Sequence, residues 1–331
     1  MLRLNRFDYI APDSLSEALD LLTEPDSTVM AGGTDVLVNI KHRVATPRRL
    51  ISIRRLPELI GMEDGAEGVT ILAGTTLADV ATDARIRSRY PALGTAAELI
   101  STPQVREVGT LGGNVCLDVR CNYYNQSYEW RKGIGFCMKR DSEICRVAPG
   151  GDRCWAVASA DTVPVLIALG AEITIASKSG TRRQQLETLY QDDGLTPLRL
   201  QPGEIVTAIH LPADPPACAY QKFRLRHSFD FPLVAVAVSI LMDGSIVRQA
   251  RIVLTAVASY PERAERAEAI LTGNALSPEI IAAAGETVFR QAKPMDNTAG
   301  SIFHRKRMAR VLFERAARRL AGIEEPLTRT A

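Results

Sequence analysis

Five of the six cysteines in this chain lie between residues 116 and 154, and closely grouped thiols are typical ligands of metal centres. The five are Cys116, Cys121, Cys137, Cys145 and Cys154, while Cys218 lies apart. Both tryptophans lie in or beside the same segment. A segment of about forty residues buries too little apolar surface to fold alone, so bound metal or disulfides would have to stabilise it.

The spacing of these cysteines leaves their ligand undetermined. No Cys-x-x-Cys pair occurs, so the pattern matches neither a zinc ribbon nor a ferredoxin-type cluster. The N-terminus lacks the features of a secretory signal, which indicates a cytoplasmic protein whose thiols stay reduced, and disulfides are therefore disfavoured. An iron–sulfur cluster, structural zinc and buried free thiols all stay open, and spacing does not select four of the six cysteines.

Two glycine-rich turns could bind the phosphates of a nucleotide. One runs from Val29 to Val36 (VMAGGTDV) and the other from Gly109 to Val115 (GTLGGNV). Paired glycines let backbone N–H groups approach a phosphate, and a helix that starts there favours negative charge. Neither turn has the spacing of a dinucleotide fingerprint or the ending of a P-loop. Either turn alone could be a plain connection, but two in one domain indicate a ligand, such as a pyrophosphate, that needs several donors.

The hydrophobic pattern predicts the helices and strands that position both turns. We expect strands at residues 29–31, 50–53, 69–74 and 172–176, and helices at 14–22, 76–83, 92–100 and 163–169. Five prolines between Pro197 and Pro216 indicate a domain boundary near residue 217. Beyond it, strands at 233–242 and 246–257 would form a hairpin at Asp243-Gly244, followed by helices at 261–271, 278–291 and 301–320. The fold class is α+β.

Composition sets few limits on partners. The chain has 331 residues, a net charge of +2 and 46% hydrophobic residues, values that are ordinary for a globular protein of two or three domains. The small net charge gives no reason to expect nucleic acid or a membrane as a partner. No apolar run approaches the roughly 20 residues that span a bilayer. Lys222, on an expected strand at 220–226, has a solvated side chain as its ordinary interpretation.

Three motifs together resemble a known family. Ala31–Asp35, Gly109–Asn114 and Ser159–Asp161, with the C-terminal segment 250–264, resemble the FAD-binding medium subunit of the xanthine dehydrogenase and carbon monoxide dehydrogenase family. The resemblance covers residues 7–320. It implies a two-lobed FAD-binding domain of the vanillyl-alcohol-oxidase-like type and a C-terminal domain of antiparallel sheet and helices. The expected bounds are 1–216, with lobes of about 1–55 and 56–216, and 217–325.

The resemblance also implies the residues that hold FAD. The first turn would bind the pyrophosphate, and the second, with Ile100, would line the flavin and ribityl region. Asp161 would bind hydroxyl groups, and Lys222 would lie near the edge of the isoalloxazine ring. The full set is Val29, Met30, Ala31, Gly32, Gly33, Thr34, Asp35, Val36, Ile100, Thr110, Gly112, Gly113, Asn114, Asp161 and Lys222. No catalytic residue is expected in this chain.

The cysteine-rich segment, residues 116–157, is an insertion relative to most of that family. Gly135–Arg140 and Pro149–Trp155 resemble the β subunit of 4-hydroxybenzoyl-CoA reductase, a branch of the family that carries an additional 4Fe–4S cluster. The ligands that this resemblance implies are Cys121, Cys137, Cys145 and Cys154. Basic side chains outnumber acidic ones around them and would offset the negative charge of a thiolate-bound cluster.

The resemblance implies an electron-transfer subunit of a molybdenum-dependent 4-hydroxybenzoyl-CoA reductase. Electrons from reduced ferredoxin would pass through the 4Fe–4S cluster and FAD toward molybdenum, for reductive dehydroxylation to benzoyl-CoA in anaerobic aromatic degradation. The partners would be a large subunit with molybdopterin and a small subunit with 2Fe–2S clusters, as a dimer of heterotrimers. The alternatives are the FAD subunit of an ordinary hydroxylating dehydrogenase of that family, and a non-catalytic docking module stapled by zinc.

Overall fold

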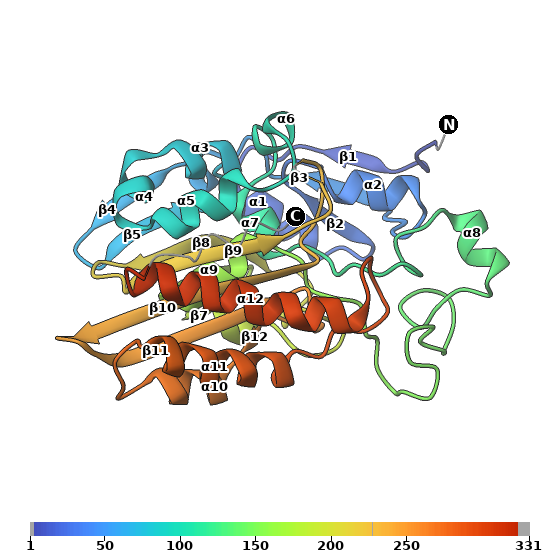
Figure 1. Cartoon of the computed structure of the whole chain (residues 1–331). Coiled ribbons are helices and arrows are strands. Elements are labelled where there is room, and N and C mark those ends of the chain that lie inside the picture. The colour runs from blue at the N-terminus through green and yellow to red at the C-terminus, as the bar shows by residue number, and fades with distance from the viewer. Residues whose placement is uncertain (1–2, 227, 324–331) are drawn as a thin grey trace.

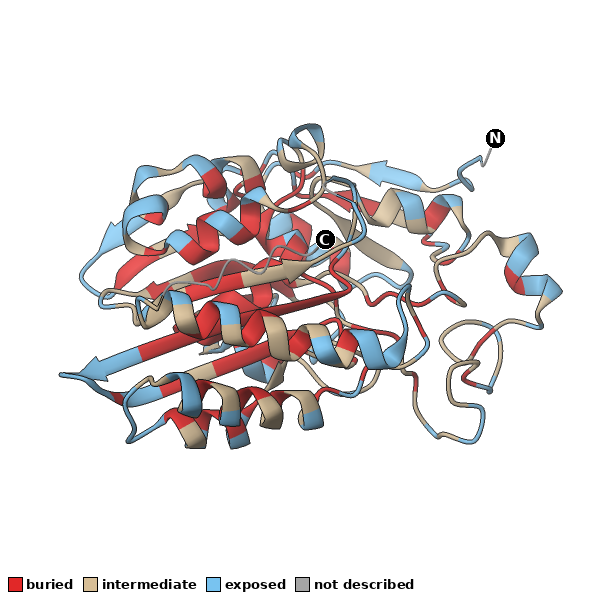
Figure 2. Ribbon diagram, viewed as in Figure 1, coloured by how far each residue is buried: buried red, intermediate tan, exposed pale blue. Residues whose placement is uncertain are grey.

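Three β-sheets with helices packed against them make up the described part of the chain, residues 3–226 and 228–323 of a computed structural model (Figure 1). The buried residues are concentrated in the sheets and in the helix faces that cover them (Figure 2). The α+β fold expected from the sequence is confirmed. The expected boundaries at residues 55 and 216 stay predictions, and the end of the second domain at 325 lies outside the described residues.

The first sheet is parallel and leads into the first glycine turn. Its strands β1 (Asp8–Ile10), β2 (Ser27–Met30) and β3 (Arg49–Ser52) pair in the order β1-β3-β2. Between β1 and β2 lies α1 (Leu15–Leu22), where the Ser14 hydroxyl accepts a hydrogen bond from the Glu17 N–H and so caps the helix. The turn after β2 ends at α2 (Val36–Lys41), so the first glycine turn does follow a strand and precede a helix.

The second sheet is antiparallel, with strand order β4-β5-β8-β6-β7. The strands are β4 (Met62–Gly65), β5 (Gly68–Leu72), β6 (Glu172–Ser177), β7 (Gly180–Gln185) and β8 (Ile205–Pro212). Between β5 and the second turn the chain forms α3 (Leu77–Thr82), α4 (Ala84–Arg89), α5 (Pro91–Glu98) and α6 (Pro103–Arg106). Two short 3-10 turns, Pro57–Leu59 and Leu186–Leu189, complete this part. The second turn then leads into α7 (Leu111–Val115).

Helix α9 (Thr162–Leu169) joins the second sheet to the third. All eight of its residues are buried, and it packs against β8 on one side and against β9, β10 and β11 on the other. A helix without a polar face must be covered all round, which explains this central position. It ends at Gly170, whose φ of +77° is the left-handed conformation typical of a glycine after a helix.

The third sheet is antiparallel, with the order β12-β11-β10-β9. The strands are β9 (Ala217–Phe223), β10 (Val234–Asp243), β11 (Ile246–Thr255) and β12 (Glu262–Arg263), and the helices are α10 (Glu265–Leu271), α11 (Pro278–Gln291) and α12 (Ile302–Leu320). The predicted hairpin at Asp243-Gly244 is confirmed. The helix predicted from residue 261 begins only at Glu265, because Glu262 and Arg263 pair with β11.

The insertion extends from the side of the molecule as a long loop with one short helix, α8 (Tyr128–Gly133), at the right of Figure 1. Its two ends are held together, since Arg120 and Val157 exchange two backbone hydrogen bonds of 2.8 Å. Val44, just beyond α2, packs with the cysteines of the insertion in one buried cluster. The insertion therefore rests on the first lobe. Within the described residues, no helix is long and apolar enough to cross a membrane.

Candidate functional site

A cavity of about 920 Å³ lies between the two glycine turns, the base of the insertion and the loop that joins β9 to β10. Sites for small molecules and cofactors typically have roughly 300–1,000 Å³. The cavity brings together every residue of the expected FAD set except Lys222. Lining it are Val29, Met30, Ala31, Gly32, Gly33, Thr34, Asp35, Val36, Ile100, Thr110, Gly112, Gly113, Asn114 and Asp161. Their contacts with FAD stay a prediction.

The first turn offers free donors to this cavity. Within the described residues, the backbone N–H groups of Gly32, Gly33 and Thr34 donate no hydrogen bond to the protein, although all three residues line the cavity. Gly33 has a φ of +74°, which glycine adopts without strain. A Cβ on Gly32 would lie 1.8 Å from the carbonyl oxygen of Val108, so the turn packs directly beside the second one. Successive unpaired N–H groups form a concave site that suits an anion.

The second turn differs because its donors are already used. Gly112 N–H donates to the Ala73 carbonyl at 2.8 Å, and Gly113 N–H donates to the Thr110 hydroxyl at 3.0 Å. A Cβ on Gly112 would lie 2.6 Å from the Cβ of Ala73, so this glycine permits close packing of α7 against the end of β5. The Asn114 side-chain oxygen accepts two hydrogen bonds from Thr162 at the start of α9. The second turn is therefore a rigid wall of the cavity.

Asp161 lies in the cavity lining and is held by two side chains of β9. Its Oδ1 lies 2.9 Å from Lys222 Nζ and accepts a hydrogen bond of 2.7 Å from the Tyr220 hydroxyl. The Lys222 side chain is 1% exposed and also donates to the Leu99 carbonyl. Lys222 is thus placed behind Asp161, and the interpretation of it as solvated is wrong. Burial raises the pKa of Asp161, while the charge of Lys222 and the Tyr220 hydrogen bond lower it.

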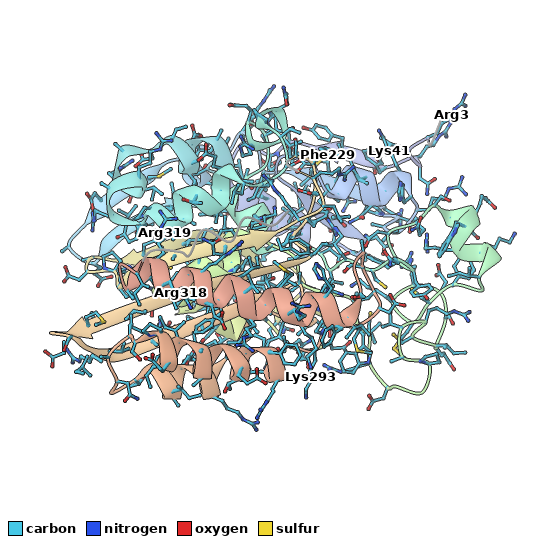
Figure 3. All side chains as sticks on the ribbon, in the orientation of Figure 1. Arg3, Lys41, Phe229, Lys293, Arg318 and Arg319 are labelled. Carbon is cyan, nitrogen blue, oxygen red and sulfur yellow. The ribbon has the colours of Figure 1, made fainter. Side chains whose placement is uncertain are left out.

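Two residues that sequence reasoning did not assign to this site also line it. Arg120, at the base of the insertion, forms a close ion pair with Asp35, and its guanidinium lies 4.4 Å from the centre of the Phe231 ring. Burial raises the pKa of Asp35, and the charge of Arg120 opposes that rise. Phe231 belongs to the loop between β9 and β10, which also carries Phe229, labelled in Figure 3. The Phe229 N–H donates to the Ser101 carbonyl. In the sequence, the signal that could have identified Phe231 was a pair of aromatic residues, Phe229 and Phe231, directly before Pro232.

A second, much smaller cavity lies inside the insertion, and all four predicted ligand cysteines line it. These are Cys121, Cys137, Cys145 and Cys154, and each of them is buried. Cys116 lines the larger cavity instead, and Cys218 lies on β9. All six thiols are free. The fold therefore separates four cysteines from the other two, a choice that spacing alone left open.

Burial favours the neutral form of three of these thiols by raising their pKa. It raises the pKa of Cys121 to about 12 and that of Cys154 to about 11, and it also raises the pKa of Cys137. The charge of Lys139, whose side chain lines the same cavity, acts in the opposite direction on Cys154. Thiols of this kind lose their protons when they bind a metal, because the thiolate is the ligand.

The four thiols can be compared with two kinds of metal centre that cysteines bind. Among the described residues, no group of three or more His, Cys, Asp or Glu side chains could hold a single metal ion as they stand. A zinc ion would need its four sulfurs at about 2.3 Å from one point. In a 4Fe–4S cluster each thiolate is bound to a different iron, so the thiols surround a volume. The four thiols line one small cavity.

Comparison with known protein families gives a match over most of the chain. Residues 5–214 match the model described as the FAD binding domain in molybdopterin dehydrogenase. Residues 218–320 match the CO dehydrogenase flavoprotein C-terminal domain. The aldehyde oxidoreductase FAD-binding subunit of Escherichia coli K12 is 32% identical over 329 residues, with 95% of this chain and 99% of that protein covered.

Similar proteins also share the fold along nearly the whole chain. The carbon monoxide dehydrogenase medium chain of Afipia carboxidovorans is 29% identical and covers 95% of this chain and 96% of its own length. A crystal structure of the Cu,Mo-CO dehydrogenase in its cyanide-inactivated form superposes with a TM-score of 0.79 at 27% identity, covering 97% of this chain and 99% of that one. The carbon monoxide dehydrogenase from Hydrogenophaga pseudoflava gives a TM-score of 0.78 at 28% identity, covering 95% and 96%.

Proposed function

The chain belongs to the FAD-binding medium subunits of the xanthine and CO dehydrogenase family of molybdenum hydroxylases, and we propose that it carries a 4Fe–4S cluster beside FAD. The observation that supports the cluster is the single cavity lined by the four buried cysteines of the insertion. Cys121 lines this cavity and the larger one, so the two cofactors would be neighbours. The chain would then be an electron-transfer subunit that holds two carriers, while the substrate site lies on a partner.

The residues of the larger cavity suit FAD. The free N–H groups of the first turn would bind the pyrophosphate, and Arg120 would add a positive charge beside them. Asp161, fixed by Lys222 and Tyr220, would accept hydrogen bonds from hydroxyl groups or ring N–H groups of the cofactor. FAD supplies the exchange of electrons in pairs or singly, and the role of these side chains is to bind and orient it.

The residues of the smaller cavity suit an iron–sulfur cluster. Tyr123, Tyr124 and Met138 line it together with the four thiols, so little water would reach the cluster. Lys139 and Arg146 bring positive charge to the same wall. Burial, hydrogen bonds and charge are the means by which a protein adjusts the potential of such a cluster.

The relatives favour an oxidising enzyme as the assembly to which this chain belongs. The two relatives described above are named as an aldehyde oxidoreductase subunit and a carbon monoxide dehydrogenase chain. We therefore propose that electrons leave a molybdenum centre on a large partner, cross a small 2Fe–2S partner and reach FAD and then the cluster in this chain. Reduction of 4-hydroxybenzoyl-CoA, with the flow reversed, is the second candidate, favoured by the insertion alone.

The first test is the metal and flavin content of this chain, purified without oxygen and separated from any partner subunit that carries iron of its own. We expect FAD with iron and sulfide in equal amounts, about four of each per FAD. FAD without iron would contradict the cluster and leave an ordinary FAD subunit. Zinc without FAD would contradict both cofactors and support the docking module. Two activity assays of the complex separate the two directions of electron flow. One uses aldehydes with an electron acceptor, and the other uses reduced ferredoxin with 4-hydroxybenzoyl-CoA.

The ligand assignment predicts the effect of Cys137→Ser. This change removes one thiolate, so we expect iron and sulfide to fall several-fold while FAD stays bound, since Cys137 does not line the larger cavity. Cys218→Ser is the matched control, because Cys218 lies on β9 away from the insertion, and it should keep full iron. Full iron content in Cys137→Ser would show that the ligand assignment is wrong.

A further inference from the structure

Lys139 lies between Cys137 and Cys145 in the sequence, and its side chain is unusually buried for a lysine. Its side chain is 8% exposed and lines the cavity of the four thiols. The Nζ atom lies 3.1 Å from Asp118 Oδ1, donates to the Gly194 carbonyl at 2.5 Å and lies 5.1 Å from the centre of the Tyr124 ring. A lysine is rarely buried without a strong reason, because its ammonium group loses hydration.

The other cations of the insertion are held differently. Arg146 also lines the cavity, but its guanidinium donates to the carbonyls of Phe136 and Gly135 and is partly exposed. Arg131 donates to the carbonyls of His42 and Arg43 in the first lobe. Lys139 has a single carboxylate partner, Asp118, which also accepts a hydrogen bond from the Tyr124 hydroxyl at 2.8 Å. Asp118 thus both fixes the ammonium group and partly cancels its charge.

We propose that Lys139 is the buried counter-charge that sets the reduction potential of the cluster, and that Asp118 positions and moderates it. This inference rests on the proposed function, because it requires a cluster in the smaller cavity. A cluster bound by four thiolates is anionic, and reduction adds one more negative charge. A fixed positive charge in a poorly hydrated wall therefore stabilises the reduced form more than the oxidised form. The carboxylate of Asp118 has the opposite effect.

Redox titration of the purified holoprotein, followed by electron paramagnetic resonance of the reduced cluster, tests the pair. Lys139→Met should make cluster reduction at least about tenfold less favourable, a fall of about 59 mV for a one-electron couple. Asp118→Asn should shift the potential in the opposite direction, because the ammonium group is then uncancelled. Lys132→Met, an exposed lysine in α8 outside the cavity lining, is the matched control and should leave the potential unchanged.

The outcomes separate this inference from the proposed function. A protein with no iron in its unchanged form contradicts the cluster itself. Iron-containing variants whose potentials do not move, or move in the same direction in Lys139→Met and Asp118→Asn, overturn the inference and leave the cluster standing. Should Lys139→Met fail to retain iron, Asp118→Asn and the charge-conserving Lys139→Arg decide the matter. A higher potential in Asp118→Asn and a near-normal potential in Lys139→Arg would support the role of Lys139 as counter-charge. An unchanged potential in Asp118→Asn would overturn it.

Discussion

The carboxylate of Asp161 is buried and forms an ion pair with Lys222, while the charge of Arg224 also acts on it. Its side chain is 4% exposed and that of Lys222 is 1% exposed, so both groups have given up most of their hydration. An ion pair in such surroundings contributes little net stability, but removing one partner leaves the other charge uncompensated. The pair therefore serves to hold an ionised carboxylate at a fixed place in the wall of the larger cavity.

Lys222→Met should lower the free energy of unfolding by about 3–5 kcal/mol at neutral pH, because it leaves Asp161 buried without its ion-pair partner. Urea unfolding followed by circular dichroism measures this loss. Lys178→Met is the matched control, since Lys178 pairs with Asp20 at the surface with 66% of its side chain exposed, and it should be neutral. A loss of the same size in both variants would contradict the role given to the buried pair.

The loss in Lys222→Met should depend on pH. Burial already raises the pKa of Asp161, and removal of Lys222 takes away the charge that opposes this rise. A carboxyl group whose folded-state pKa is raised binds its proton more tightly in the folded protein, so stability is greatest below its ordinary pKa of about 3.9 and falls as pH rises through the folded-state value. The deficit of the variant relative to the unchanged protein should therefore shrink toward about pH 4. A deficit independent of pH would contradict this explanation.

The two glycine turns illustrate what single residues reveal before the structure is known. Both were expected to approach a ligand because both contain paired glycines followed by a helix. In the structure Gly32 and Gly33 leave unpaired N–H groups at the cavity, whereas Gly112 is small in order to pack on Ala73. Sequence reveals that a side chain is absent but not which neighbour occupies its place. The sequence likewise did not reveal that the side chain of Lys222 is buried, because the neighbours that cover it are distant in the sequence.

At the scale of elements, α8 is one of the parts that attach the insertion to the first lobe. The Arg131 side chain is fully buried, and its Nη2 donates to the carbonyls of His42 and Arg43 at 3.1 and 2.9 Å. These carbonyls lie at the C-terminal end of α2, where a cation is favoured. The rings of Tyr128 and Phe136 lie 5.9 Å from the same guanidinium. One arginine thus joins the thiol-bearing loop to the helix that follows the first glycine turn.

Arg131→Met should loosen the insertion without removing any thiol. We expect slower iron incorporation and faster proteolysis within residues 127–150, with FAD content unchanged, because the contact to α2 is lost while the cavity lining is intact. Limited proteolysis with iron assay measures both effects. Arg140→Met is the control, since its guanidinium is 39% exposed and contacts the first lobe by one 3.4 Å hydrogen bond. Equal proteolysis in the two variants would show that Arg131 is not the anchor.

Elements with a strong local signal were predicted, and those defined by distant partners were not. The Asp243-Gly244 hairpin and the buried helix α9 both appear where the pattern placed them. Strand β8 was missed because Ile205–Pro212 lies in the proline-rich stretch taken as a linker, yet it is the strand between β5 and β6. The start of α10 was placed too early because the pairing of β12 with β11 is non-local.

At the scale of the whole molecule, the larger cavity is built from parts far apart in the sequence. The first lobe contributes Asp35, the base of the insertion contributes Arg120, and the C-terminal part contributes Phe231 and Leu233. Asn297, also in the C-terminal part, accepts a hydrogen bond from the Asn122 N–H and donates one to the Trp155 carbonyl, at the two ends of the insertion. A ligand in this cavity therefore contacts both family domains at once.

FAD should consequently stabilise the chain as one unit. At a free FAD concentration a hundred times the dissociation constant, mass action adds about 2.7 kcal/mol to the free energy of unfolding. Calorimetry of protein with equal iron content should show a single transition that moves upward with FAD. Phe231→Ala should reduce this shift, because it removes the ring on which Arg120 rests, whereas Phe303→Ala, 63% exposed on α12, should not. The contrary result would be two separate transitions, with FAD shifting only the transition of the N-terminal part. It would mean that the C-terminal part contributes no binding energy and that Phe231 lies beside the site without binding FAD.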